Sequence, residues 1–276
     1  MSVDLLKADR YLRQMLIADP DRLKFGASVV GAGAIGSVVV IALAKLGMKN
    51  IKVFDPDVFS LHNVANQLCL ESGHLGTNKA ISIANLANSM SAPIEGKLRV
   101  TGYPAKIEKE KVVFNSKPSE FSSAGESLFI GKDPVLAKDL FEGIVISCPD
   151  CMEARKDVWQ TAKMNPRTPY LIDCRMAAQW MQILVVNTMS VKDHRRYEAS
   201  LISNEDATPE PCGARGIIYT SLRAGASITN IVKRLQLGEL VPDEINEDIS
   251  SGSVTIKVRE KTVSNATELA LATAEY

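Results

Sequence analysis

ASVVGAGAIG, residues 27–36, is the stretch of this sequence that decides the fold. Its first four residues predict a short strand, and Gly31, Gly33 and Gly36 follow where a helix is expected to begin. Glycines at a strand-to-helix turn let backbone N–H groups approach a phosphate, and the positive end of the helix dipole favours an anion there. The stretch therefore predicts a nucleotide-binding turn.

The residues that follow the glycines complete a βαβ unit. Residues 37–46 are small and apolar and predict a helix that stops at Gly47, and residues 51–54 predict a second strand. Asp55 ends that strand, 19 residues after Gly36. A carboxylate at this place can accept hydrogen bonds from a ribose hydroxyl, although an aspartate in a turn or a helix cap would look the same.

The rest of the chain predicts an α/β fold, with a Rossmann-like, doubly wound, mostly parallel sheet that continues into a second, mixed or antiparallel half. Residues 9–16 predict a leading helix, residues 103–138 an irregular insertion and residues 190–210 a polar loop. The other expected elements are helices at 79–90 and 215–235 and strands at 98–100, 144–147, 170–173, 181–186 and 254–258.

The composition narrows the class of protein. The 276 residues carry 32 basic and 32 acidic side chains, so the positive charge that attracts nucleic acid or an anionic membrane is missing. A charged N-terminus and the lack of a long apolar run argue against a signal peptide or a membrane span, and favour a cytoplasmic protein. Five cysteines, an odd number, argue against a disulfide framework.

Two further stretches separate the possible nucleotide-binding proteins, because the glycine pattern alone would also fit an NAD-dependent oxidoreductase. Residues 55–67 read DPDVFSLHNVANQ and residues 75–80 read LGTNKA. They resemble the ThiF/MoeB, ubiquitin-activating-enzyme-like family, which carries D-x-D-x-V-x-x-x-N-x-x-R-Q and then G-x-x-K-A. The resemblance extends to RYLRQ at 10–14, PDCMEAR at 149–155 and Pro211-Cys212, and covers about residues 9 to 236.

The resemblance implies an activity, its cofactors and its partners. Members of the family use ATP and Mg²⁺ to adenylate the C-terminal carboxylate, usually of a glycine, of a ubiquitin-like or sulfur-carrier protein, and release pyrophosphate. It also implies a homodimer. We therefore expect a single adenylation domain over residues 1–240, with a short helix at 5–18, a nucleotide-binding half at 25–150 and a substrate-side half at 151–240. A polar extension at 241–276 is expected to follow.

The same resemblance assigns roles to individual residues. Lys79 contacts phosphate, Asp150 holds the metal, and Arg13 reaches the nucleotide across the dimer interface. Such cations and carboxylates suit an in-line transfer at phosphorus, which depends on positioning and on charge. The remaining candidate nucleotide-binding residues are Asp57, Asn63 and Gln67. Arg13 and Lys79 would otherwise be solvated surface cations, and Asn63 and Gln67 would otherwise serve a turn.

Several residues depart from the family pattern or leave alternatives open. Asn66 stands where the family has arginine, and Cys148 and Cys151 form only one of the two pairs that a structural zinc site needs. Cys212 precedes a helix whose dipole would favour a thiolate, so it is a candidate nucleophile. Asp173 and Arg175 would either guide a peptide tail or form a structural ion pair. A nucleotide-binding partner subunit with little activity is the main alternative function.

Overall fold

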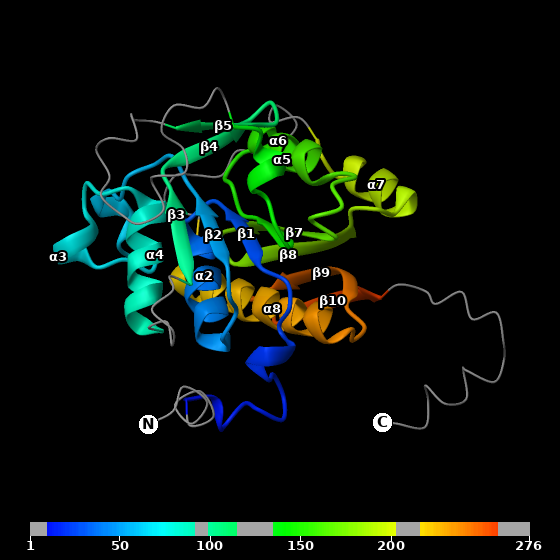
Figure 1. The fold of residues 1–276 in the computed structure, drawn as a ribbon, viewed down its shortest axis with the longest axis horizontal. Helices are drawn as coiled ribbons and strands as arrows, with labels where there is room; N and C mark the ends of the chain where they lie inside the picture. The colour runs from blue at the N-terminus through cyan, green and yellow to red at the C-terminus, as the bar shows by residue number, and fades with distance from the viewer. Residues whose placement is uncertain (1–9, 92–98, 115–134, 203–215, 259–276) are drawn as a thin grey trace, which may run out of the picture.

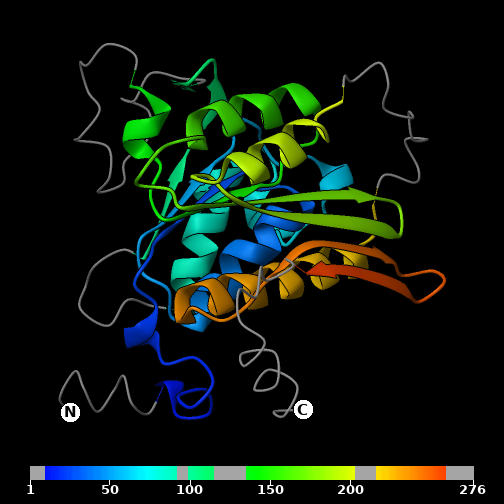
Figure 2. The ribbon, with the colours of Figure 1, turned by 90° about the vertical axis from the view of Figure 1, so that its right-hand side faces the viewer.

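The computed structural model describes residues 10–91, 99–114, 135–202 and 216–258, and these residues build one large sheet with helices on both faces (Figures 1 and 2). The sheet has eight strands in the order β10-β9-β8-β7-β6-β1-β2-β3. The parallel strands are β1 (Ala27–Val30), β2 (Ile51–Phe54), β3 (Val100–Tyr103), β6 (Ile144–Ser147) and β7 (Tyr170–Ala177). The antiparallel strands are β8 (Trp180–Asn187), β9 (Pro242–Asp248) and β10 (Ser253–Val258). The expected fold class is confirmed.

Two helical layers cover the sheet. Helices α2 (Ala34–Leu46), α4 (Lys79–Met90) and α8 (Ile218–Leu237) lie on one face, and α6 (Met152–Ala162) and α7 (Val191–Glu198) lie on the other (Figure 1). The strands alternate between the two cores: Ile146 packs in the cluster beneath α2 and α8, whereas Val145 packs in the cluster beneath α6. No helix in these described ranges is long and apolar enough to cross a membrane.

The predicted βαβ unit forms as its sequence indicates. All four residues of β1 are buried, and β1 pairs in parallel with β2 on one side and with β6 on the other. Helix α2 ends at Gly47, whose φ of 99° lies in the left-handed region that favours glycine. The unit places residues 31–36 at the carboxyl edge of the central strand.

The prediction of a leading helix is wrong over most of the described residues of that segment. Only Arg10 and Tyr11 are helical, and residues 12–17 form turns. The Gln14 amide donates instead to the carbonyl oxygens of Ala18 and Leu46, and the Tyr11 hydroxyl accepts from Arg99. Tertiary hydrogen bonds to the end of α2 therefore replace the helix that the apolar spacing suggested.

Two segments expected to be irregular carry regular structure. Residues 105–114 form the hairpin β4 (Ala105–Glu108) and β5 (Lys111–Phe114), which is followed after a gap in the described residues by α5 (Ala137–Leu140). The expected loop at 190–210 contains α7, which Ser190 caps through a hydrogen bond from the Asp193 N–H. Few residues of α7 are apolar, so the sequence did not predict a helix here. The helix packs on Trp159 through the rings of His194 and Tyr197.

The residues after 240 also join the fold. Strand β9 pairs with β8, and β10 pairs with β9, so residues 242–258 extend the main sheet rather than follow it as a polar extension. The polar side chains of β9 are used in tertiary contacts: Glu247 is buried and accepts from Arg223 on α8. Opposite charges on facing elements account for a strand that hydrophobic periodicity did not predict.

Candidate functional site

The glycine turn between β1 and α2 has no room for side chains at two of its glycines. Gly31 has a φ of +93°, and a Cβ on it would lie 2.6 Å from the carbonyl oxygen of Cys148. A Cβ on Gly36 would overlap the carbonyl oxygen of Gly31. Gly33 is the N-cap of helix α2, which has no side-chain cap and no acidic residue in its first turn. Its first N–H groups and its dipole therefore offer a site for an anion.

The substitution Gly36→Ala should damage this turn. The added methyl group overlaps backbone rather than a flexible side chain, so we expect the free energy of unfolding to fall by about 1–3 kcal/mol. Urea denaturation of the wild type and the variant measures this change. Gly73→Ala is the matched control, because a Cβ there meets nothing within 4 Å. Equal stability of the two variants would contradict the close approach at Gly36.

Asp55 is tied to the turn by both of its carboxylate oxygens. Oδ2 accepts from the Ala32 N–H at 2.6 Å, and Oδ1 accepts from the Asp57 N–H at 2.8 Å. Only 5% of the residue is exposed, and this burial raises the pKa of its carboxyl group although the two N–H groups act against the rise. Asp55 thus serves the turn, which was one of its two possible roles, and a ribose contact stays a prediction.

Lys79 and Asp57 form an ion pair beside the glycine turn. Lys79 is the first residue of α4, and its side chain is only 11% exposed, whereas that of Asp57 is 64% exposed. The Lys79 Nζ lies 3.3 Å from Asp57 Oδ2. The Asn78 amide holds the two segments together by donating to the backbone carbonyls of Asp55 and Asp57. Lys79 is therefore a positioned cation and not a solvated one.

Residues 60–68 follow β2 and reach the first turn of α2 at Gln67 and Leu68. Asn63 closes a capping box, with its Oδ1 accepting from the Ser60 N–H at 2.9 Å, so it has the turn role that the sequence left open. The Leu68 N–H donates to Ser37 Oγ at 3.1 Å, and Gln67 Nε2 lies 3.9 Å from the Cβ position of Gly33. Of the polar residues in this segment, Gln67 is the one placed next to the anion site.

Asp150 reaches the same edge of the sheet from β6. Strand β6 is the parallel neighbour of β1, and the Cys148 N–H donates to the Val30 carbonyl oxygen at 2.8 Å. Asp150 follows two residues later, before α6, and is exposed. Within the described part of the chain, no three or more His, Cys, Asp or Glu residues gather closely enough to hold a metal ion. A metal here would thus need ligands from a bound nucleotide as well as Asp150.

Comparison with known proteins decides the family. The model of the ThiF family matches residues 22–266. The chain belongs to the ThiF family. Among curated relatives, the NEDD8-activating enzyme E1 catalytic subunit of Dictyostelium discoideum is 24% identical over 207 residues, 67% of this chain and 44% of that protein. The adenylyltransferase and sulfurtransferase MOCS3 of Arabidopsis thaliana is 30% identical over 92 residues, 31% of this chain and 20% of that protein. This ThiF chain thus spans less than half the length of both relatives.

Solved structures share the ThiF fold at low sequence identity. MccB of E. coli, crystallised with ATP, has a TM-score of 0.62 at 14% identity, with 93% of this chain and 74% of that chain covered. PaaA has a TM-score of 0.62 at 14% identity, with 92% and 73% covered. The E. coli tRNA N6-threonylcarbamoyladenosine dehydratase TcdA has a TM-score of 0.55 at 15% identity, with 86% and 98% covered. At such identities the likeness establishes the fold alone.

Arg13 of this ThiF chain lies far from its own glycine turn. It is exposed in the segment whose Gln14 bonds the Leu46 carbonyl at the C-terminal end of α2. The glycine turn is at the other end of that helix, which has 13 residues and is therefore about 20 Å long. Arg13 can serve a nucleotide only in a second subunit.

The thiols of Cys148 and Cys174 have a raised pKa. Desolvation raises the pKa of the Cys148 thiol to about 12, with a smaller opposing effect of Arg155. Burial also raises the pKa of the Cys174 thiol well above its usual value. Neither thiol has the lowered pKa of a nucleophile. Cys212, the candidate nucleophile, lies outside the described residues.

Alkylation tests the state of Cys148. At pH 8, a thiol with a pKa of about 12 is ionised in about one molecule in ten thousand, so iodoacetamide should leave Cys148 unlabelled in the folded protein. Peptide mass mapping reads the labelling site by site. Unfolding in guanidinium chloride is the control, because all five cysteines should then react. Prompt labelling of Cys148 in the folded protein would contradict the raised pKa.

Asp173, Arg155 and Arg175 form a buried ion cluster after Asp150 that the sequence did not predict. Asp173 is fully buried at the end of the parallel part of β7, and it pairs with Arg155 from α6 and, at 2.9 Å, with Arg175. Arg155 also donates to the carbonyl oxygens of Pro149 and Cys174, and Arg175 donates to Ser200. Asp173 and Arg175 therefore form the structural ion pair that was one of their two readings. Arg155 was visible in the sequence only as the last residue of PDCMEAR.

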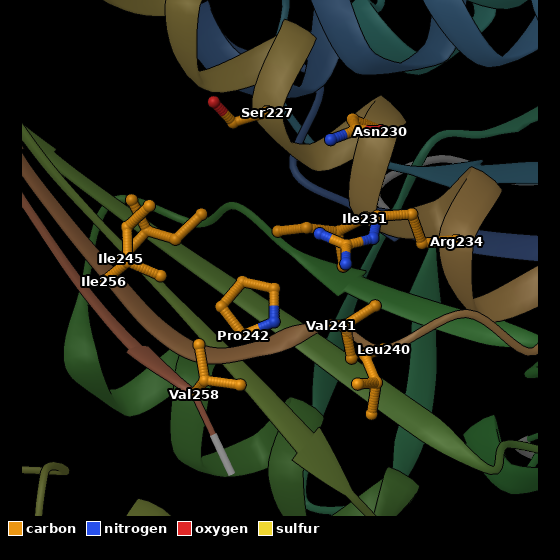
Figure 3. Close-up of a pocket in the computed structure, with 10 residues that line it drawn as sticks. All are labelled: Ser227, Asn230, Ile231, Arg234, Leu240, Val241, Pro242, Ile245, Ile256 and Val258. Atoms are coloured by element: carbon orange, nitrogen blue, oxygen red, sulfur yellow. The ribbon is translucent and has the colours of Figure 1, made fainter. Parts of the chain in front are cut away.

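An apolar pocket lies elsewhere on the ThiF fold, between α8 and the β9–β10 hairpin (Figure 3). Its lining comes from α8, from Leu240 and Val241 after that helix and from the two strands, with Arg234 as its one charged side chain. The end of α8 contacts the start of β1, where Gln236 bonds Phe25. The pocket is therefore remote from the carboxyl edge that carries the glycine turn, and it shares no residue with the candidate site.

Proposed function

We propose that this protein adenylates the C-terminal carboxylate of a ubiquitin-like or sulfur-carrier protein with ATP and Mg²⁺, as a homodimer in the cytoplasm. The observation that carries the proposal is the uncapped start of α2 beside the buried Lys79, because together they offer dipole and charge to a polyphosphate. Membership of the ThiF family supports an adenylyltransferase-type enzyme. So do a relative named for NEDD8 activation and one named an adenylyltransferase.

The site residues fit ATP from three sides. The first N–H groups of α2 would receive the phosphates, with Lys79 as their counter-charge. Asp57, whose carboxylate is exposed and partly neutralised by Lys79, is better available to the ribose hydroxyls than Asp55. Asp150 is exposed at the same edge and would complete the coordination of a Mg²⁺ ion held by the phosphates. When bound, the metal neutralises charge on the phosphate oxygens.

In this reaction the protein positions the reactants and takes no part in covalent bonds. A carboxylate oxygen of the carrier attacks the α-phosphorus, and the bond from that phosphorus to the oxygen of the leaving pyrophosphate breaks. Asp55 holds the glycine turn in place, the α2 N-terminus orients the phosphates, and Lys79 offsets the charge that develops on their oxygens. Arg13 would assist only from the partner subunit. Transfer of the acyl group to Cys212 stays a prediction.

A nucleotide-binding subunit with little activity is the second candidate function. Asn66 favours it, because a neutral amide stands where the family pattern has a cation. Loss of one charge-assisted contact to phosphate costs about 1.5–3 kcal/mol. Lys79 remains to supply a positive charge near the phosphates.

Two measurements test the proposal: ATP–pyrophosphate exchange in the presence of a carrier protein, and calorimetry with ATP and with NAD. We expect exchange that depends on the carrier, and ATP binding that Asp57→Ala weakens about tenfold or more through the loss of hydrogen bonds to a charged group. Glu71→Ala, a change of an exposed acid on α3 (Glu71–His74), is the control. ATP binding without exchange would favour the weakly active subunit, and binding of NAD alone would overturn the assignment.

A further inference from the structure

Two neighbouring amide oxygens are buried without a donor beside the glycine turn. They are Oδ1 of Asn66 and Oε1 of Gln67, and no residue in the described ranges donates a hydrogen bond to either. Buried polar atoms in folded proteins nearly always have a partner, and each one without a partner costs about 1–3 kcal/mol. Two adjacent acceptors of this kind can accept hydrogen bonds from the donors of a ligand.

The pair lies between the nucleotide half and the substrate half of the site. Gln67 faces the start of α2, where its Nε2 is 3.9 Å from the Cβ position of Gly33. Asn66 faces the other way: its backbone carbonyl accepts from Ser221 Oγ on α8, and its Nδ2 is 4.0 Å from the Cβ position of Gly216. The side chain of Met176, at the end of β7, meets the same position of Gly216.

We propose that Asn66 and Gln67 bind the peptide tail of the carrier protein, with their side-chain oxygens accepting hydrogen bonds from the last two backbone N–H groups before its carboxylate. This places the tail between α8 and the start of α2, with the carboxylate directed at the phosphates. The proposal rests on the adenylation function. It makes the two amides specificity residues for the acyl substrate rather than for ATP.

The position of the pair favours a peptide over the nucleotide. Phosphate oxygens accept hydrogen bonds and do not donate them, so they cannot satisfy carbonyl oxygens. The donors of ATP are on its ribose and adenine, for which the proposed function uses Asp57 after β2. In the sheet, β2 and β7 are separated by β1 and β6, three strand spacings or about 14 Å. Asn66 lies beside Gly216 and Ser221, next to Met176 of β7, and so on the far side of the site from Asp57.

The residue type at position 66 agrees with this assignment. Arginine, which the family pattern has at this place, carries only donors and suits a phosphate. Asparagine at the same place supplies a carbonyl oxygen and no charge, which suits a neutral peptide N–H group. With asparagine in place of arginine, residue 66 is therefore suited to bind the acyl substrate and not the nucleotide.

The experiment removes the N–H groups from the ligand as well as the acceptors from the protein. The probes are a synthetic pentapeptide that ends in Gly-Gly and two analogues in which the last or the next-to-last amide is an ester, which lacks the N–H donor and adds no bulk. Calorimetry measures their binding to the full chain with a non-hydrolysable ATP analogue present. The variants are Asn66→Leu and Gln67→Met, and Asn230→Leu in the remote pocket is the control.

We expect the wild type and the control to prefer the all-amide peptide about 5- to 10-fold over at least one ester, as the loss of one hydrogen bond implies. The preference should fall below about twofold in Asn66→Leu or in Gln67→Met. In Asn66→Leu, binding of the ATP analogue should stay within about twofold of wild type. A preference that persists in both variants, or variants that weaken only ATP binding, would overturn the inference alone. ATP binding by the wild type with no peptide binding at all would overturn the carrier substrate as well.

Discussion

Replacing Lys79 by methionine is expected to lower the rate of ATP–pyrophosphate exchange by about 100- to 1000-fold, the usual effect of removing one preorganised group that stabilises charge in a transition state. The Lys79 side chain is only 11% exposed at the start of α4, and Asp57 fixes its position from 3.3 Å. Because this charge is already in place, it costs no reorganisation when the phosphate oxygens become more negative. Methionine keeps much of the length and packing of the side chain and removes only the charge. Steady-state exchange assays over a range of ATP concentrations measure the effect.

The control for this prediction is Lys45→Met, which also removes one positive charge. Lys45 lies at the C-terminal end of α2, away from the glycine turn. Lys45 is exposed in the last turn of that helix, where its Nζ bonds the Met90 carbonyl oxygen. We expect exchange within about twofold of wild type, because an exposed charge at this distance is screened by salt. If both variants lost activity equally, the net charge of the protein and not the position of Lys79 would be responsible.

Asp173→Asn is expected to reduce the free energy of unfolding by about 3–5 kcal/mol, because it leaves two largely buried arginines without their anion. Asp173 is fully buried, and the side chains of Arg155 and Arg175 are 7% and 13% exposed. Asparagine has the same shape as aspartate, so the loss reports charge rather than packing. Urea denaturation followed by circular dichroism measures the change, with equal slopes required for a valid comparison.

Two further variants separate burial of charge from the presence of an ion pair. Glu142→Gln breaks the Lys52–Glu142 pair, whose side chains are 20% and 42% exposed, and it should cost less than about 1 kcal/mol. The triple change Arg155→Met, Asp173→Leu and Arg175→Met removes all the buried charges together, and it should be less destabilising than Asp173→Asn. A triple variant that is less stable than the single one would show that the hydrogen bonds of the cluster, and not its uncompensated charge, hold this region.

The elements that could be predicted from the sequence are those with a local hydrophobic or glycine signal. Strand β1, helix α2 and strand β2 formed at the expected positions because hydrophobic runs and glycines are local signals that need no partner to be read. Helix α7 and strand β9 were missed because their residues are mostly polar. They are stabilised by contacts with distant elements, such as Tyr197 against Trp159 and Glu247 against Arg223.

The sequence alone predicted the family and the candidate site residues, because the family motifs occur in the expected order along the chain. The roles of Asp55 and Lys79 were open at that stage. Asp55 differs from Asp57 because it is buried and both of its carboxylate oxygens accept from backbone N–H groups. Lys79 differs from an ordinary surface lysine because it is largely buried and pairs with an exposed carboxylate. Such distinctions depend on what surrounds a side chain, which spacing does not report.

By itself, the sequence determined the α/β class, the βαβ unit with its glycine turn and membership of the ThiF family, because these depend on local periodicity and on residues close together in the chain. Only the tertiary structure decided that Arg13 lies at the far end of α2, that Asp173 joins two arginines from different elements, and that the side-chain oxygens of Asn66 and Gln67 are buried between α2 and α8. The physical reason is that burial and electrostatic pairing arise from segments that meet only after the sheet has assembled.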